Sequence, residues 1–250
     1  VAYENLEEID KWALTRLNKL VKDCTKAFDE YDFNKAYQAI NQFCVVDMSN
    51  FYLDIIKDRL YTYKKASTAR RAAQTAMYEI LHSLVRILAP MISFTAEEIW
   101  EFMPHREGES TESVMLTMWP EVKPEYDNKE LSEKWDKIIA LKEEVAKKLE
   151  LARADKTIGH SLNAQVTIFA DGEKYDFIKS VENELLQVFI VSDLEIVKDT
   201  KKDEDTTFGI AVEISVAEGE KCERCWMYSK TVGQDEANPT ICHRCSENLE

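Results

Sequence analysis

The sequence has no long apolar run and little glycine, proline or histidine. No stretch approaches the roughly 20 consecutive apolar residues that a membrane-spanning helix requires. The most apolar segment, residues 77–94, is interrupted by Glu79, His82 and Arg86. No secretory signal peptide is evident. With only 6 Gly and 5 Pro among 250 residues, a turn-rich sheet protein is disfavoured and long helices are expected.

The charge of the chain is strongly acidic. There are 47 acidic and 32 basic residues, for a net charge of −15, which argues against a protein that coats nucleic acid through a uniformly basic surface. Hydrophobic residues make up 45% of the chain, so a core can form in one large domain or in two to three small ones. Because the chain begins with Val1 and not with Met, we expect it to be a piece of a longer protein.

Residues 1–155 are predicted to form a helical domain. Apolar side chains recur at three- and four-residue steps, which is typical of amphipathic helices, in the segments 9–27, 33–44, 51–63, 68–88 and 131–152. A kink is expected at residues 47–50. The last of these helices has coiled-coil-like spacing and is predicted to pack along the bundle.

A further helix is predicted to start with "SFTAEEIW", residues 93–100. Thr95 and Glu98 have the spacing of a capping box, and Phe94 and Ile99 that of a hydrophobic staple. A connector follows at residues 104–129, where proline and glycine interrupt the pattern. Within it, "SVMLTMWPE" is predicted to be a short buried element.

Residues 156–217 are predicted to form a small α+β domain. The segments 164–170, 193–199 and 209–217 have the composition and alternation of strands, and residues 175–191 are predicted to form one helix. Residues 218–250 form a cysteine-rich hook. The predicted fold class is therefore mainly α, with a helical bundle followed by a small α+β domain that ends in a four-cysteine zinc hook.

Two Cys-x-x-Cys pairs, separated by 16 residues, carry the strongest chemical signal. Four thiolates so spaced suit a tetrahedral Zn²⁺ ion, and with four sulfurs the site is closed, so the zinc is expected to be structural. The alternatives are two disulfides, which suit an exported chain, or unpaired thiols; His243 is a weaker candidate ligand. The predicted ligands are Cys222, Cys225, Cys242 and Cys245.

Two groups of residues are candidates for RNA contact. Arg224 and Trp226 lie on the turn formed by the first cysteine pair, which we call the knuckle. An arginine there suits phosphate and an aromatic ring suits an unpaired base. The alternatives are solvation for Arg224 and packing against the knuckle for Trp226. Residues 57–71 contain six cations and one acid, a net charge of +5, with tyrosines interleaved. This segment suits a single-stranded RNA loop or is a solvated junction between helices. Its cations are Lys57, Arg59, Lys64, Lys65, Arg70 and Arg71.

Taken together, these features resemble the carboxy-terminal part of bacterial-type isoleucyl-tRNA synthetases. The resemblance covers nearly the whole chain and rests on residues 31–63, 70–104, 113–121 and 219–245, which include "LAPMISFTAEEIW" and "GEKCERCW". It implies an anticodon-binding helical domain against the anticodon stem-loop, a junction domain, and a zinc hook that folds over the tRNA. By the same resemblance the four cysteines match the zinc ligands of the family, and Arg224 and Trp226 match knuckle positions near the RNA.

The resemblance also implies what lies elsewhere. The His-Ile-Gly-His and Lys-Met-Ser-Lys-Ser signatures of the ATP site do not occur in the sequence, so ATP is expected to bind only in a missing catalytic domain, and this piece is expected to be inactive alone. The editing domain is also absent, so discrimination between isoleucine and valine by editing is not expected to reside in these residues. The expected partners are isoleucine tRNA and the remaining domains of the parent. The expected state is a cytoplasmic monomer that contacts no membrane.

Two other functions are compatible with parts of the sequence. A zinc-stabilised scaffold for protein interactions shares the metal site but not the RNA. A free-standing enzyme is disfavoured, because the four histidines, His82, His105, His160 and His243, form no recognisable catalytic grouping with hydroxyl or carboxylate residues. No catalytic residue is therefore predicted.

Overall fold

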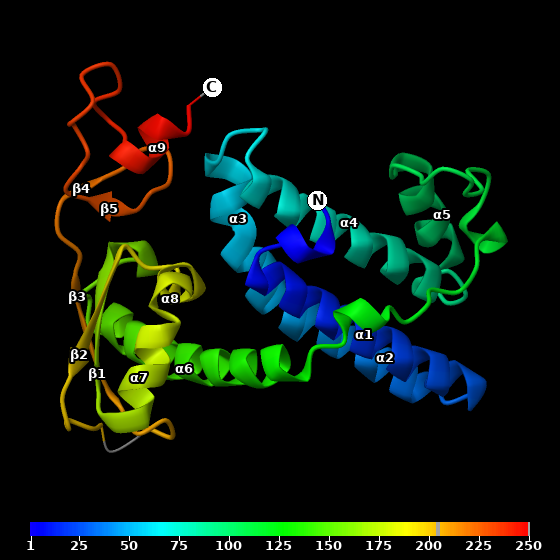
Figure 1. Cartoon of the computed structure of the whole chain (residues 1–250), viewed down its shortest axis with the longest axis horizontal. Helices are drawn as coiled ribbons and strands as arrows, with labels where there is room; N and C mark the ends of the chain where they lie inside the picture. Colours follow the sequence, from blue (N-terminus) through cyan, green and yellow to red (C-terminus); the bar gives the residue numbers. More distant parts are fainter. Residues whose placement is uncertain (204–205, 250) are drawn as a thin grey trace. The chain divides into compact units, whose positions relative to one another are not determined.

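The computed structural model describes residues 1–203 and 206–249 of the chain (Figure 1). It is mainly helical, with small sheets and a cluster of four cysteines near the carboxyl end, so the predicted fold class is confirmed. The chain divides into two compact units. Unit 1 comprises Val1–Leu60 and Lys65–Ser132, and unit 2 comprises Tyr61–Lys64 and Glu133–Glu250. Positions 204–205 and 250 fall within predicted domains but lie outside the described residues.

Unit 1 is a bundle of helices joined by short turns. Its longest members lie close to the predicted segments, because their apolar side chains repeat with the helical period and become the buried core. The helices are η1 (Tyr3–Asn5), α1 (Glu8–Asp29), α2 (Phe33–Asn41), α3 (Leu53–Thr62), α4 (Thr68–Leu88) and α5 (Ser93–Phe102). The largest fully buried side chains of this unit include Trp12, Tyr52 and Trp100.

A π-helix, η2 (Gln42–Tyr52), joins α2 to α3 where a kink was predicted. The chain therefore passes through residues 47–50 without a break. The wider turn buries Phe43, Met48 and Phe51. It also places the Asp47 carboxylate against Arg16 of α1, with Nε–Oδ2 and Nη2–Oδ1 distances of 3.0 and 3.1 Å. Such helices are rare and short in proteins, which is why periodicity alone did not predict one.

A buried ion pair holds α1, η2, α3 and the start of α4 together. The carboxylate of Asp10, which is fully buried, accepts hydrogen bonds from Tyr52 Oη at 2.8 Å and from both terminal nitrogens of Arg59 at 2.6 and 3.0 Å. Arg59 Nη1 also donates to the carbonyl of Ala69 at 3.3 Å. Burial works against the charge of Arg59, but the bonds to Asp10 outweigh it and raise the pKa of the guanidinium.

Helix α5 begins two residues before the predicted capping box. Ser93 is its first residue, and its hydroxyl donates to the carbonyl of Ala89 at 2.9 Å. Phe94 therefore lies inside the helix, and its side chain is 94% exposed. The predictions of a Thr95–Glu98 capping box and a Phe94–Ile99 hydrophobic staple are both wrong, because the helix already begins in the turn after α4.

The connector between α5 and α6 contains two 3-10 turns, η3 (Val114–Leu116) and η4 (Pro124–Tyr126). It was predicted to hold a short buried element, but only part of that element is buried. Val114 packs with Trp100 and Val85. Met115, Leu116 and Met118 are exposed.

Further along the connector, Lys123 Nζ lies 2.8 Å from Glu79 Oε2 of α4, and Arg106 Nη2 lies 2.7 Å from Glu79 Oε1. One carboxylate of α4 therefore anchors the connector at two points.

Unit 2 is built on a three-stranded sheet of order β2-β1-β3. Strand β1 (Ala164–Ala170) pairs parallel with β2 (Asp193–Lys198) and antiparallel with β3 (Ala211–Val216). The residues of β1 are alternately buried and half-buried, as the predicted alternation requires. The remaining elements are α6 (Lys129–Ala154), η5 (Ser161–Asn163), α7 (Gly172–Ser180), α8 (Glu182–Phe189), β4 (Glu220–Lys221), β5 (Tyr228–Ser229) and α9 (His243–Glu247).

Two predictions for this part of the chain differ from the structure. Residues 175–191 form two helices, because the chain turns at Val181 (φ −115°, ψ 12°). Helix α6 was predicted to pack along the bundle, but from Glu133 onward it belongs to unit 2. Its Glu144 accepts hydrogen bonds from Thr207, and its Lys148 pairs with Asp203 at 2.9 Å.

The two compact units divide after Ser132, before the predicted domain boundary at residue 155. That domain boundary stays a prediction. Within the described part of the chain, no helix combines the length and apolarity needed to cross a membrane.

Replacement of Asp10 by alanine should destabilise the chain strongly. Removal of one member of a buried ion pair leaves the other charge unpaired, which costs about 3–5 kcal/mol. The matched control is Asp54→Ala, because Asp54 pairs with Lys57 at an exposed site, where such pairs contribute about 0–1 kcal/mol. Urea unfolding followed by tryptophan fluorescence measures both variants. Equal losses would contradict the importance of the buried pair.

The Glu79 carboxylate should make the stability of unit 1 depend on pH. Burial opposes its ionisation, but Lys123 and Arg106 outweigh burial, so its folded-state pKa lies below the ordinary value of 4.5. Its contribution is therefore fully present above pH 4.5 and is lost as the pH falls through the folded-state pKa. Glu79→Gln should lower the stability near neutral pH and flatten this acid-side slope. A variant profile parallel to that of the original chain in pH-dependent urea unfolding would refute the assignment.

Candidate metal centre and nucleic-acid interface

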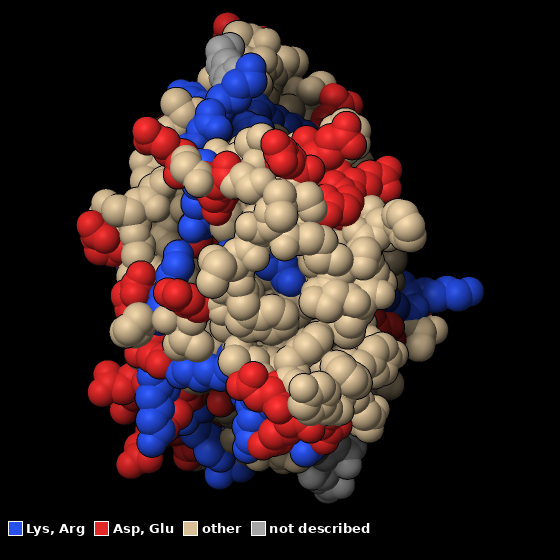
Figure 2. All heavy atoms as spheres, turned by 90° about the vertical axis from the view of Figure 1, so that its right-hand side faces the viewer, with Lys and Arg blue, Asp and Glu red and all other residues tan. Residues whose placement is uncertain are grey.

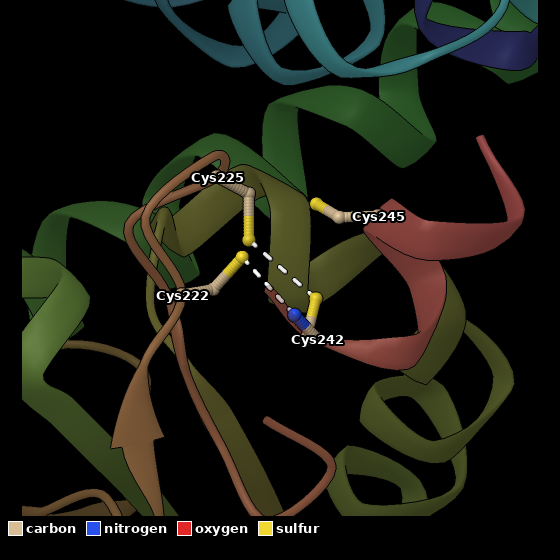
Figure 3. Close-up of side chains that lie close together, drawn as sticks. All are labelled: Cys222, Cys225, Cys242 and Cys245. Carbon is tan, nitrogen blue, oxygen red and sulfur yellow. Dashed lines mark hydrogen bonds between the residues drawn. The ribbon is translucent and has the colours of Figure 1, made fainter. Parts of the chain in front are cut away.

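The four cysteines of the hook meet at one point, as Figure 3 shows. Cys222 and Cys225 come from the turn after β4, and Cys242 and Cys245 come from the start of α9. Their sulfur atoms all lie within 4.8 Å of one another. The Sγ atoms of Cys225 and Cys242 are 3.8 Å apart, whereas a disulfide bond is about 2.05 Å long. The structure therefore holds four free thiols and no disulfide among them.

This arrangement fits zinc. In a tetrahedral site with Zn–S bonds of about 2.3 Å, neighbouring sulfurs lie about 3.8 Å apart. Among the described residues of the hook, the core beyond the cysteines consists of Ile241 and the partly buried Val232. Since so small a core supplies little free energy, binding of the ion would supply much of the stability of the hook. Zinc held by four thiolates has no open position, so its role would be structural.

Local backbone geometry brings the thiols together. The amide of Trp226 donates to the carbonyl of Cys222, and the amide of Cys222 donates to the carbonyl of Met227, both at 2.9 Å. Gly219, with φ of 97°, starts the β4–β5 hairpin. A Cβ atom there would lie 2.3 to 2.5 Å from the backbone of Ser229 and Lys230, so this position requires glycine.

The second cysteine pair is held against the first by the loop between them. The amide of Cys242 donates to the sulfur of Cys222 at 3.3 Å, and the amide of His243 donates to Thr231 Oγ1 at 3.1 Å. The hydroxyl of Ser246 donates to Asp235. The hook is attached to the sheet of unit 2 by the Tyr228 amide, which donates to Ser192 Oγ at 2.7 Å.

The pKa values of two of the thiols, Cys225 and Cys245, are shifted in opposite directions. The pKa of Cys225 is lowered to about 4, first because Cys245 donates a hydrogen bond to its sulfur and also because Arg244 lies beside it. The pKa of Cys245 is raised by the same bond and by burial. A metal ion that took all four sulfurs as thiolates would displace the remaining protons, so its binding would weaken as the pH falls.

The two knuckle residues predicted to contact RNA have different surroundings. Trp226 is 60% exposed in a left-handed conformation (φ 64°), so the packing alternative does not describe it. The ammonium group of Lys221 lies 5.3 Å from the centre of its ring. Arg224 is half-buried, and its Nη1 donates to the carbonyl of Cys245 at 3.3 Å. Arg224 therefore links the two cysteine pairs.

The basic segment, residues 57–71, surrounds the turn between α3 and α4. Lys64, Lys65 and Arg71 are exposed and Arg70 is half-buried. Lys57 is exposed on α3 and pairs with Asp54 at 2.8 Å. Arg71 Nη1 donates to Gln74 Oε1 at 2.9 Å.

Arg59 was predicted to belong to this basic surface, but its side chain is only 4% exposed and is bound to Asp10. A phosphate cannot reach it without breaking the buried pair. The prediction for Arg59 is wrong because its partner lies 49 residues away in the sequence, and no local pattern reveals that partner.

Lys221 was not predicted to belong to the site. It lies in β4, directly before the first cysteine, and the knuckle turn brings Trp226 back over it. A signal was present, because a Cys-x-x-Cys turn reverses the chain and places the residue before it near the residue after it.

Comparison with known proteins agrees with this geometry. Residues 10–168, more than half of the chain, match the model of the anticodon-binding domain of tRNA ligases. Residues 219–248 match the zinc finger found in FPG and IleRS. The chain belongs to the anticodon-binding domain family of tRNA ligases. Its second family match covers all four cysteines of the hook.

The relatives of this anticodon-binding chain include isoleucine–tRNA ligases. That of Caldanaerobacter subterraneus subsp. tengcongensis is 50% identical over 253 residues, which cover 99% of this chain and 27% of the relative. That of Caldicellulosiruptor saccharolyticus is 51% identical, with 99% and 26% covered, and that of Geobacter sulfurreducens is 44% identical, with 98% and 26% covered. The predicted resemblance to isoleucyl-tRNA synthetases is confirmed. The chain spans about a quarter of the length of these relatives.

Loss of one cysteine should release the metal and unfold the hook while the rest of this anticodon-binding chain stays folded. Cys225→Ser should lose bound zinc, measured by inductively coupled plasma mass spectrometry, because three thiolates do not complete the closed site. Cys24→Ser is the matched control, since Cys24 is buried in α1. Helical circular dichroism should change little in Cys225→Ser. Full retention of zinc by that variant would contradict the four-thiolate site.

Proposed function

We propose that this chain is the tRNA-recognition part of an isoleucyl-tRNA synthetase, which ligates isoleucine to its tRNA with ATP. It binds and positions the anticodon stem-loop side of the tRNA and holds one structural zinc ion. One observation carries the proposal: the anticodon-binding domain and the four-cysteine finger occur together in a chain that is about 50% identical to isoleucine–tRNA ligases over nearly its whole length.

The start of α4 suits the phosphate backbone. Its first turn contains no acidic residue, and its N-cap, Ser67, makes no side-chain capping bond. Amide groups at a helix amino terminus favour anions. Arg70 and Arg71 lie in the first turn, and Lys64 and Lys65 precede it. These four cations support phosphate contact at this turn, with Lys57 further back on α3.

The knuckle of the hook suits an unpaired base. The exposed ring of Trp226 offers a stacking face, and base–aromatic stacking contributes about 1–3 kcal/mol per base. Lys221 places a positive charge 5.3 Å from the same ring. Arg224 donates from Nη1 to the carbonyl of Cys245 at 3.3 Å and from Nη2 to the carbonyl of Thr62 at 3.0 Å, so its contribution to RNA binding would be through the shape of the knuckle.

The chemistry of ligation would lie outside this chain. His82 is buried, with Nε2 2.7 Å from Glu109 and Nδ1 3.0 Å from Arg86, which is a structural arrangement. ATP and isoleucine would bind in the other domains of the parent, and the chain alone would be inactive. It would act in the cytoplasm as a monomer, with isoleucine tRNA and those domains as its partners.

The direct test is a titration of the zinc-loaded chain with isoleucine tRNA and with a non-cognate tRNA at two salt concentrations. The proposal expects tighter binding of the cognate tRNA and weaker binding at higher salt, because phosphate contacts release counterions. Equal binding of the two tRNAs would reject recognition by this chain. Absence of binding to both would favour the zinc-stabilised scaffold for protein interactions.

A double variant, Arg70→Ala with Arg71→Ala, tests the phosphate contacts. Each lost contact should reduce the salt dependence of log K by about 1, so the slope should fall by about 2. Lys179→Ala on α7 is the control, because Lys179 pairs with Glu182 at an exposed site. Fluorescence anisotropy with labelled tRNA at several salt concentrations measures the slopes. An unchanged slope in the double variant would contradict contact at the start of α4.

A further inference from the structure

Unit 1 exposes a group of large apolar side chains along the connector and the α1–α2 turn. We name it the connector strip; it consists of Tyr31, Phe33, Met115, Leu116 and Met118. Tyr31 is 81%, Leu116 64% and Met118 82% exposed. Large contiguous apolar surfaces on folded proteins usually mark interaction sites. Figure 2 shows that side chains without charge occupy much of the centre of one face, with acidic and basic side chains around them.

Contacts within unit 1 join the parts of the strip. Trp119 follows Met118, and its ring packs edge-on against that of Phe28, with the ring centres 5.0 Å apart. Its Nε1 donates a hydrogen bond to Thr25 Oγ1 at 2.8 Å. Phe28 contacts Phe33, which contacts Tyr31. The backbone beneath the strip is therefore held in place, and its exposed side chains form a defined surface.

The connector end of the strip is held just as firmly. The amide of Val114 donates to Glu97 of α5 at 3.2 Å, and the carbonyl of Met118 accepts from Arg86 of α4 at 3.2 Å. The exposed methionines thus stand on a fixed support. Their flexible thioether side chains adapt readily to an apolar partner.

The surrounding charge disfavours RNA. Residues 93–121, which include α5 and most of the connector, contain seven glutamates and one arginine, a net charge of −6. That arginine, Arg106, pairs with Glu79. Arg86 also reaches the strip, but its other nitrogens bond to the carbonyl and ring of His82. Since RNA binding depends on cations that meet phosphates, a strip bordered in this way suits a protein surface.

We propose that the connector strip docks against a protein surface supplied by the part of the synthetase that these 250 residues do not include. Similar isoleucine–tRNA ligases are about four times as long as this chain, so most of such an enzyme lies outside it. The partner surface is apolar at its centre and basic at its rim, complementary to the acidic border. This inference rests on the proposed function in one respect, that the chain is part of a synthetase, and is independent of whether the chain binds RNA.

The test is hydroxyl-radical footprinting of the methionine side chains, read by mass spectrometry. Three samples are compared: this chain alone, the full-length synthetase that contains it, and the full-length enzyme with isoleucine tRNA. Met115 and Met118 should oxidise several-fold more slowly in the full-length enzyme without tRNA than in the chain alone. Met48, which is buried, should be slow in all three samples and serves as the internal reference.

Three outcomes would overturn the proposal. Equal rates in the chain and the full-length enzyme would show that no protein segment covers the strip. Protection that appears only when tRNA is added would assign the strip to RNA. Protection in the isolated chain that rises with its concentration would assign it to a second copy.

A charge variant tests the same contact from the other side. Met118→Glu in the full-length enzyme should raise the oxidation rate of Met115 toward its rate in the isolated chain, because an acidic group disrupts an apolar contact. Leu151→Glu, at another exposed apolar position on α6, is the control and should leave that rate unchanged. An unchanged Met115 rate in Met118→Glu would count against docking, provided that circular dichroism shows both variants folded.

Discussion

The helical unit depends on one buried carboxylate. The Asp10 side chain is fully buried, and its two carboxylate oxygens accept hydrogen bonds from Tyr52 of η2 and Arg59 of α3. Arg59 also donates a hydrogen bond to a backbone carbonyl of α4. A charge in this position is tolerated only because it is paired and fully hydrogen-bonded. The same pairing removes Arg59 from the basic surface. One interaction thus organises the bundle and restricts the cations that are available to a phosphate.

The hook follows the opposite principle, because it has almost no apolar core. Its order comes from four thiols that converge, from a glycine that permits close approach of two strands, and from hydrogen bonds between the loop and α9. In such a segment, metal binding and folding are one equilibrium. Trp226 can consequently stay exposed, since the hook does not need its ring as core.

Charge and apolarity are separated on the surface of this acidic chain. Cations gather at residues 57–71, whereas residues 93–121 are acidic and carry exposed methionine, leucine and phenylalanine. The first arrangement attracts an anionic partner and the second repels one. This separation would let a family member with a net charge of −15 take up tRNA on one surface and keep a different surface for protein contact.

Patterns that act over short distances were readable from the sequence. The spacing of Cys222, Cys225, Cys242 and Cys245, the 3.6-residue period of α1 and α4, and the alternation of β1 all arise from local geometry. The tertiary structure alone decided the burial of Arg59, the π-helix at Gln42–Tyr52 and the exposure of Met118. Each of these depends on partners distant in the chain, since the free energy of a side chain is set by what it contacts and not by its neighbours in sequence.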